Sequence, residues 1–280
     1  MDAKNLLVKT AYLDELKPLQ KTYKIGDEGD EVIKIKEWLM LWQLDENYIS
    51  ALVDIKVHKE FNENTEKIVK EIQAFLDLPQ SGEVDPATWT ALTSPMSKAF
   101  SLAAYNHGTV RERMVYFAIK HLQYRSSELL ADNMGPWVRA YMDGNEGTLE
   151  YWCEGFACTI LDQTFSSFDI PFTKYYANTW ACETMREHAR ETNLLVTNEQ
   201  LQAKEYTPQA GDMVLYISDK DNKAHHTEIV YEVLDKERGN FLTIGGNTNF
   251  AGSRNGVGVF LVDRNFLNKN VEIVKMIEQV

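Results

Sequence analysis

The chain has 280 residues, of which 44% are hydrophobic and 25% are charged, so it can build a sizeable core and is not a mainly disordered polypeptide. At roughly 150 residues per domain, this length predicts one or two domains. The formal net charge of −13 argues against nonspecific binding to nucleic acid or to an anionic membrane surface, because both are polyanions.

The N-terminal segment has no basic start followed by an apolar stretch and a small-residue cleavage site, so it predicts no Sec signal. No apolar run approaches the roughly 18 residues that a membrane span requires. We therefore expect synthesis in the cytoplasm and no membrane span.

Three short helices are predicted in the N-terminal third. The first covers Asp30 to Trp42, where apolar residues recur at helical spacing. The second follows Asn64 or Thr65 as its N-cap, and the third runs from Asp85, as N-cap, to Leu92. Residues 1–95 contain no arginine and the remainder contains nine, which indicates a domain boundary near residue 95.

The helical segment over residues 21–95 resembles a peptidoglycan-binding module. The resemblance rests on KIGDEGDEVIKIKEWLMLW, on NTEKIVKEIQAFLDLPQ and, most specifically, on the closing GEVDPATWTAL. The loop over residues 44–63 lacks the Asp-Gly-x-(Phe/Tyr)-Gly turn of that module and carries VDIKVHKEFNENT instead. The resemblance implies wall binding; the alternative is a spacer or docking domain that keeps the fold without the ligand.

The remainder of the chain predicts helices first and strands afterwards. The expected helices cover residues 109–125, 152–165 and 181–191, and the expected strands cover 213–217, 227–234, 241–244, 256–262 and 271–277. This order is typical of an α+β domain with a mostly antiparallel sheet.

The three cysteines are too few, and odd in number, for a disulfide framework. Cys153 is expected in the first turn of the helix at 152–165, where free N–H groups and the helix dipole favour a thiolate. Cys158 lies inside the same helix in an apolar setting, which is typical of a packed core cysteine. Cys182 has no obvious partner in the sequence.

A histidine and an asparagine are placed to assist Cys153. His226 begins one predicted strand, and Asn247 ends the next, so antiparallel pairing would bring them side by side. An imidazole can hold a thiolate and protonate a leaving amine, and an amide oxygen can accept from the imidazole and orient it. The chain order is Cys, His, Asn, as in papain-like enzymes.

The C-terminal region resembles the CHAP family of cysteine, histidine-dependent amidohydrolases and peptidases. Five short motifs occur in the order of that family: NMGPWV from Asn133, WCEGF from Trp152, PQAGDMV from Pro208, HTEIV from His226 and TIGGNT from Thr243. The family has His-(Val/Thr)-Gly-Ile-Val where this chain has Glu228 in the third place. It often has Glu two residues before the Asn, where this chain has Gly245.

The resemblance implies that Cys153 is the nucleophile, His226 the general base and acid, and Asn247 the matching asparagine. It implies a papain-like domain with helices packed on an antiparallel sheet, and no cofactor. Trp152, Trp137 and Glu228 are candidates for the substrate cleft. If a carboxylate normally orients the imidazole, Gly245 weakens activity or leaves that role to Asn247.

Other readings of the polar residues stay open. His225 would point to the opposite face of its strand and is the alternative catalytic histidine. The adjacent histidines lack a third ligand at zinc spacing, and residues 143–147 lack the full pattern of a calcium loop, so no metal site is predicted.

We therefore expect an extension at 1–20, a peptidoglycan-binding-like domain at 21–95, a linker at 96–108 and a CHAP-like domain at 109–280. The expected activity is that of a monomeric peptidoglycan hydrolase, an N-acetylmuramoyl-L-alanine amidase or endopeptidase. It would act at the cell wall or in the periplasm after non-Sec export or lysis. The alternatives are a non-catalytic wall-binding scaffold with a decayed hydrolase domain, and an amidase acting on a non-wall amide such as glutathionylspermidine.

Overall fold

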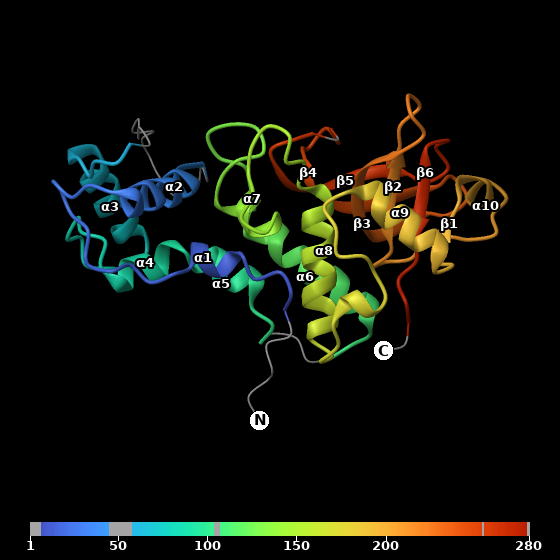
Figure 1. Ribbon diagram of the computed structural model, residues 1–280, viewed down its shortest axis with the longest axis horizontal. Coiled ribbons are helices and arrows are strands. Elements are labelled where there is room, and N and C mark those ends of the chain that lie inside the picture. Colours follow the sequence, from blue (N-terminus) through green and yellow to red (C-terminus); the bar gives the residue numbers. More distant parts are fainter. Residues whose placement is uncertain (1–6, 45–57, 104–106, 254, 279–280) are drawn as a thin grey trace.

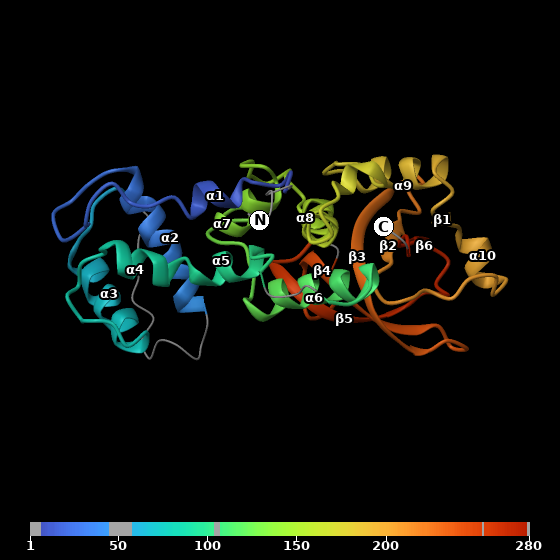
Figure 2. The same ribbon diagram turned by 90° about the horizontal axis from the view of Figure 1, so that it is seen from below.

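The computed structural model describes residues 7–44, 58–103, 107–253 and 255–278. The molecule is elongated, with a helical unit at one end and a β-sheet at the other (Figure 1). Helix α7 lies between these two ends in both views, and α6 and α8 lie against β3 and β4 of the sheet (Figures 1 and 2). None of the helices in the described ranges has the length and apolar content that crossing a membrane requires.

The N-terminal unit contains the three predicted helices. Its elements are α1 (Tyr12–Glu15), α2 (Asp30–Leu44), α3 (Glu63–Phe75), α4 (Pro86–Leu92) and α5 (Ser94–Phe100). Asp85 caps α4 as predicted, through a hydrogen bond from the Thr88 N–H. The cap of α3 is Asn62 rather than Asn64 or Thr65, because Asn62 has the extended backbone of an N-cap and its Oδ1 accepts from the Thr65 N–H.

The C-terminal region begins with helices, as predicted. They are α6 (Val110–Gln123), α7 (Pro136–Tyr141), α8 (Cys153–Ser166), the 3-10 helix η1 (Phe172–Lys174), α9 (Cys182–Glu191) and α10 (Asn198–Gln202). A capping box fixes the start of α6, with Thr109 and Glu112 exchanging side-chain-to-backbone hydrogen bonds. The short helices α7 and α10 escape detection by periodicity because each has only one or two turns.

The strands form one antiparallel sheet in the order β1-β6-β2-β3-β4-β5. They are β1 (Leu195–Val196), β2 (Met213–Ile217), β3 (Ala224–Asp235), β4 (Asn240–Thr248), β5 (Gly258–Asn265) and β6 (Val271–Val274). The five predicted strands are β2 to β6, and the predicted antiparallel α+β arrangement is confirmed. The additional strand, β1, has two residues, which is too short to show an alternating pattern.

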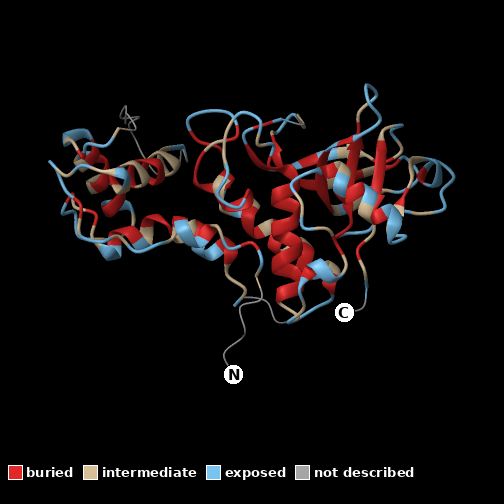
Figure 3. Cartoon of the chain, in the orientation of Figure 1, coloured by how far each residue is buried: buried red, intermediate tan, exposed pale blue. Residues whose placement is uncertain are grey.

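Helix α8 packs against β3 and β4, and every one of its residues is buried (Figure 3). The close packing of α8 on β4 requires a glycine in that strand. A Cβ built on Gly246 would lie 2.7 Å from the Phe156 Cβ, which is too close for two carbon atoms. Gly246 therefore lets the N-terminal half of α8, which carries Cys153, lie directly on β4.

The two units share one hydrophobic core. The predicted boundary at residue 95 falls inside α5, whose Met96, Ala99 and Phe100 are buried. The rings of Trp38 in α2 and Trp137 in α7 meet edge to face, with centroids 6.4 Å apart. The helical module is thus packed against the C-terminal region rather than tethered to it by an open linker.

Candidate active site

Cys153 is the first residue of α8, as predicted, and its side chain is buried against β3. Its Sγ atom lies 3.7 Å from the Sγ atom of Cys182. Both residues are buried, with exposed fractions of 2% for Cys153 and 5% for Cys182. Cys182 is the first residue of α9, so two helix N-termini present a thiol at the same place. Their sequence separation of 29 residues hid this contact from pattern analysis.

The surroundings of Cys153 favour its thiolate. The hydrogen bond from Cys182 lowers the pKa of Cys153 well below its usual value; burial opposes this, and the neighbouring His226 lowers the pKa further. The same contact with Cys153 raises the pKa of Cys182, and burial raises it further, so Cys182 is the protonated donor. Cys158 is also held as a thiol, because burial and the nearby Glu154 raise its pKa.

His226 lies on β3 with no exposed surface. Its Nε2 lies 3.2 Å from the Glu228 Oε1, and Nδ1 has no hydrogen-bond partner of regular geometry among the described residues. Nδ1 is therefore the nitrogen available to Cys153, the neighbour whose pKa His226 lowers. Burial alone would lower the pKa of His226, but Cys153 and Glu228 together raise it to about 9.

The contact predicted between Asn247 and His226 is not made. The Asn247 Nδ2 donates to the Asn133 Oδ1 at 2.8 Å, and its Oδ1 accepts from the Gly256 N–H at 3.0 Å. Asn247 has a φ of +53°, and the register of β4 with β5 shifts between Gly245 and Thr248. Because of this irregularity, the Asn247 side chain does not point toward His226, as regular alternation along the strand would require.

Glu228 is not a cleft residue, because it is fully buried. Its carboxylate accepts hydrogen bonds from His226 and from three further side chains: Tyr216 Oη at 2.6 Å, Thr243 Oγ1 at 2.6 Å and Arg264 Nε at 2.9 Å. Burial would raise the pKa of Glu228, but His226 and Arg264 hold it well below its usual value. Glu228 is therefore a charged partner of His226, not a group that meets the cationic end of a substrate.

The two tryptophans predicted in the cleft take different places. Trp152 has no exposed surface; its ring stacks on Tyr141, and its Nε1 donates to the Glu128 Oε1 at 2.8 Å. Trp152 therefore supports the wall of the site from behind. Trp137 lines a groove of about 1040 Å³ between α2 and the C-terminal region.

This groove is mostly apolar and connects the two units. Its walls include Trp38 and Trp42 of α2, the segment 122–132 from the end of α6 onward, and the start of β5. Glu128, the acceptor for Trp152, lies in the same wall. The groove is thus linked to Trp152, the residue before Cys153, through the hydrogen bond that Glu128 accepts.

The remaining polar candidates are engaged elsewhere. His225 is exposed and pairs with Asp221 at 2.8 Å. In the 143–147 segment, Asp143 binds the buried Lys9 and Glu146 binds Arg139, so two oxygen ligands of the considered calcium loop already have cationic partners. No cluster of three or more His, Cys, Asp or Glu side chains in the described ranges is arranged to hold a metal ion.

Sequence reasoning missed Cys182 as a neighbour of Cys153 and Glu228 as a partner of His226. The second could have been found, because residues two apart on a strand share a face. Arg264 and Tyr216, which hold Glu228, lie on other strands and carry no local signal. Cys153 and His226, which were predicted to pair, lie close enough for each to shift the pKa of the other.

One comparison with known proteins gives a match. Residues 28–92 match the family model of a peptidoglycan binding domain, which covers α2, α3 and α4. No curated protein and no solved structure gives a significant match. The chain therefore carries a peptidoglycan-binding module packed against an α+β region, and this module supports association with the cell wall.

Proposed function

We propose that the chain is a monomeric peptidoglycan hydrolase that cleaves an amide bond of the stem peptide through the Cys153 thiolate. The bond would be that of an N-acetylmuramoyl-L-alanine amidase or an endopeptidase. The observation that carries the proposal is the buried Cys153–His226 pair at the N-terminus of α8, in a chain whose matched peptidoglycan-binding module shares its hydrophobic core.

The chemistry follows from the charges at the site. The Cys153 Sγ attacks the amide carbonyl carbon, and the developing oxyanion is stabilised by the dipole and free N–H groups at the start of α8. Protonated His226 gives its proton to the leaving nitrogen as the C–N bond breaks and a thioester forms. His226 then takes a proton from water, which attacks the thioester and releases the acid and the thiolate.

A papain-like arrangement is supported by the geometry, since a helix N-terminus carries the cysteine and an antiparallel strand carries the histidine. The apolar groove supports a role for the helical module in holding substrate, because it is walled by both units. Aromatic walls suit sugar rings and do not depend on attraction between charges. That is consistent with a chain of net charge −13 acting on a wall that carries anionic polymers.

The test is hydrolysis of purified peptidoglycan by the wild type, Cys153→Ala and the matched control Cys158→Ala. Cys158 lies on the same helix and is equally buried, but its pKa is raised and it faces Glu154. Cys153→Ala should reduce the release of amines at least about a hundredfold, with Cys158→Ala close to the wild type. Mass spectrometry of products from a defined muropeptide identifies the bond; hydrolysis at the wild-type rate by Cys153→Ala would overturn the proposal.

A further inference from the structure

The carboxylate of Glu228 lies behind His226 as part of a closed hydrogen-bonding cluster. Tyr216 from β2, Thr243 from β4 and Arg264 from β5 all donate to it. These donors come from β2 on one side of β3 and from β4 and β5 on the other. These three hydrogen bonds reach Oε2, while Oε1 accepts from His226 and from the second terminal nitrogen of Arg264, so both oxygens are held and the carboxylate has one orientation.

Strand geometry explains why the carboxylate reaches the imidazole. His226 and Glu228 are two residues apart on β3 and therefore share a face. The Glu228 Oε1 accepts from the His226 Nε2, which leaves Nδ1 for Cys153. An acceptor on one ring nitrogen fixes the tautomer and the ring plane that the other nitrogen presents.

Gly245 on the neighbouring strand makes room for this carboxylate. A Cβ built on Gly245 would lie 2.6 Å from the Glu228 Cγ and 3.1 Å from its Cδ and Oε1. Any side chain at residue 245 would therefore enter the space that Glu228 occupies. The family that the C-terminal region resembles has glycine where this chain has Glu228, and often has glutamate where this chain has Gly245.

We infer that Glu228 is the positioning residue for His226. Its carboxylate comes from β3, and the lack of a side chain at Gly245 on the neighbouring strand β4 leaves space for it. The glycine at residue 245 is then no sign of a decayed site. Glu228 would position His226 for the hydrolysis proposed above, and to that extent the inference rests on the proposed function. The effect of Glu228 on the Cys153–His226 pair can be measured without hydrolysis.

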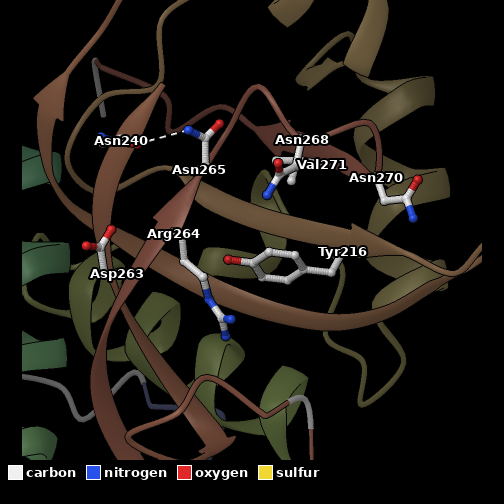
Figure 4. A pocket seen from close by; sticks show the side chains of 8 residues that line it. All are labelled: Tyr216, Asn240, Asp263, Arg264, Asn265, Asn268, Asn270 and Val271. Carbon is white, nitrogen blue, oxygen red and sulfur yellow. Dashed lines mark hydrogen bonds between the residues drawn. The ribbon is translucent and has the colours of Figure 1, made fainter. Parts of the chain in front are cut away.

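Arg264 and Tyr216 also connect this cluster to the surface. Both line a pocket of about 390 Å³ on the sheet, together with Asn240, Asn265, Asn268 and Asn270 (Figure 4). The Arg264 side chain keeps 15% of its surface exposed while its guanidinium binds Glu228. Arg264 therefore balances the buried negative charge, which would otherwise be costly to hold beside a catalytic pair.

The test measures alkylation of Cys153 by iodoacetamide as a function of pH, with the modified cysteine identified by mass spectrometry. Glu228→Gln keeps the shape of the side chain but removes the charge that favours protonated His226. Less of His226 is then protonated beside the Cys153 thiolate, which raises the pKa of Cys153. Half-maximal alkylation should therefore move to higher pH by about one unit or more. Glu228→Gly should move it in the same direction.

The double variant Glu228→Gly with Gly245→Glu provides the decisive rescue. It returns a carboxylate to the same space from β4, so alkylation should regain the wild-type pH dependence that Glu228→Gly has lost. Asp221→Asn is the matched control, because it removes a carboxylate from the exposed His225 and should leave the profile unchanged. A merely structural role for Glu228 would lower stability without this charge-specific shift and rescue.

A wild-type alkylation profile in Glu228→Gln would overturn the inference, as would failure of the double variant to improve on Glu228→Gly. Urea unfolding of each variant identifies any that does not fold, and the near-isosteric Glu228→Gln then carries the test. Alkylation needs no peptidoglycan. A pH shift with rescue in a protein that does not hydrolyse the wall would therefore keep this inference and reject the proposed function.

Discussion

At the scale of single residues, the low pKa of Cys153 depends on a second thiol. Cys182 donates to Cys153 across 3.7 Å, and this contact is the main cause of the low pKa of Cys153. His226 adds to the effect from β3, and burial opposes both. The reactivity of Cys153 thus depends on the position of α9 as well as on the histidine.

Replacing Cys182 with Ala should therefore raise the pKa of Cys153. The alanine removes the S–H donor and leaves His226 as the remaining stabilising group, so the alkylation rate of Cys153 near neutral pH should fall several-fold. Rates measured from pH 4 to 10 report the change, with Cys158→Ala as control. An unchanged inflection in Cys182→Ala would show that the second thiol does not stabilise the thiolate.

At the scale of helices and strands, the long periodic segments could be predicted and the irregular ones could not. The helix that begins at Cys153 and the strands of His226 and Asn247 follow from apolar spacing. The side-chain direction of Asn247 does not, because a positive φ and a register shift break the alternation just there. The partners of Glu228 lie on three other strands, so only the assembled sheet brings them together.

Helix α6 is joined to α7 and α8 by a buried histidine. The Nδ1 of His121 lies 2.7 Å from the Tyr141 Oη, and its Nε2 lies 2.9 Å from the Gln163 Oε1. Burial lowers the pKa of His121 to about 3. Because this value lies below that of the unfolded chain, about 6.5, the neutral ring contributes stability above pH 6.5 that is lost progressively as the pH falls toward 3.

The variant His121→Gln removes this titration. The free energy of unfolding of the wild type relative to His121→Gln should fall by about 1.4 kcal/mol for each pH unit below 6.5, down to about pH 3. Urea unfolding of both proteins at pH 7, 6 and 5 measures the difference, and other titrating groups cancel in the comparison. A difference that stays constant with pH would contradict this account of α6.

At the scale of the whole molecule, Arg139 links the two units by ion pairs in addition to their shared hydrophobic core. Arg139 of α7 binds Glu15 of α1, Glu37 of α2 and Glu146 of the following loop. Arg139 keeps only 16% of its side chain exposed, and Glu15 and Glu37 are more deeply buried. The composition shift near residue 95 predicted two units but gave no sign of this shared, charged interface.

Arg139→Met should therefore destabilise the protein far more than the loss of a surface ion pair. It leaves buried carboxylates without a partner, at a cost of about 3–5 kcal/mol in the free energy of unfolding. The control is Arg238→Met, because Arg238 is 83% exposed and its pair with Asp235 should contribute less than about 0.5 kcal/mol. Urea unfolding compares the two, and equal losses would show that Arg139 does not fasten the interface.

In the proposed function, one thiolate, that of Cys153, carries out the hydrolysis of peptidoglycan. The most direct test is to treat the wild type with limiting iodoacetamide and to follow both the modified cysteine and the remaining hydrolysis of purified peptidoglycan. Hydrolysis should decline in direct proportion to alkylation of Cys153, with Cys158 and Cys182 unmodified. Undiminished hydrolysis by protein in which Cys153 is fully alkylated would contradict the account.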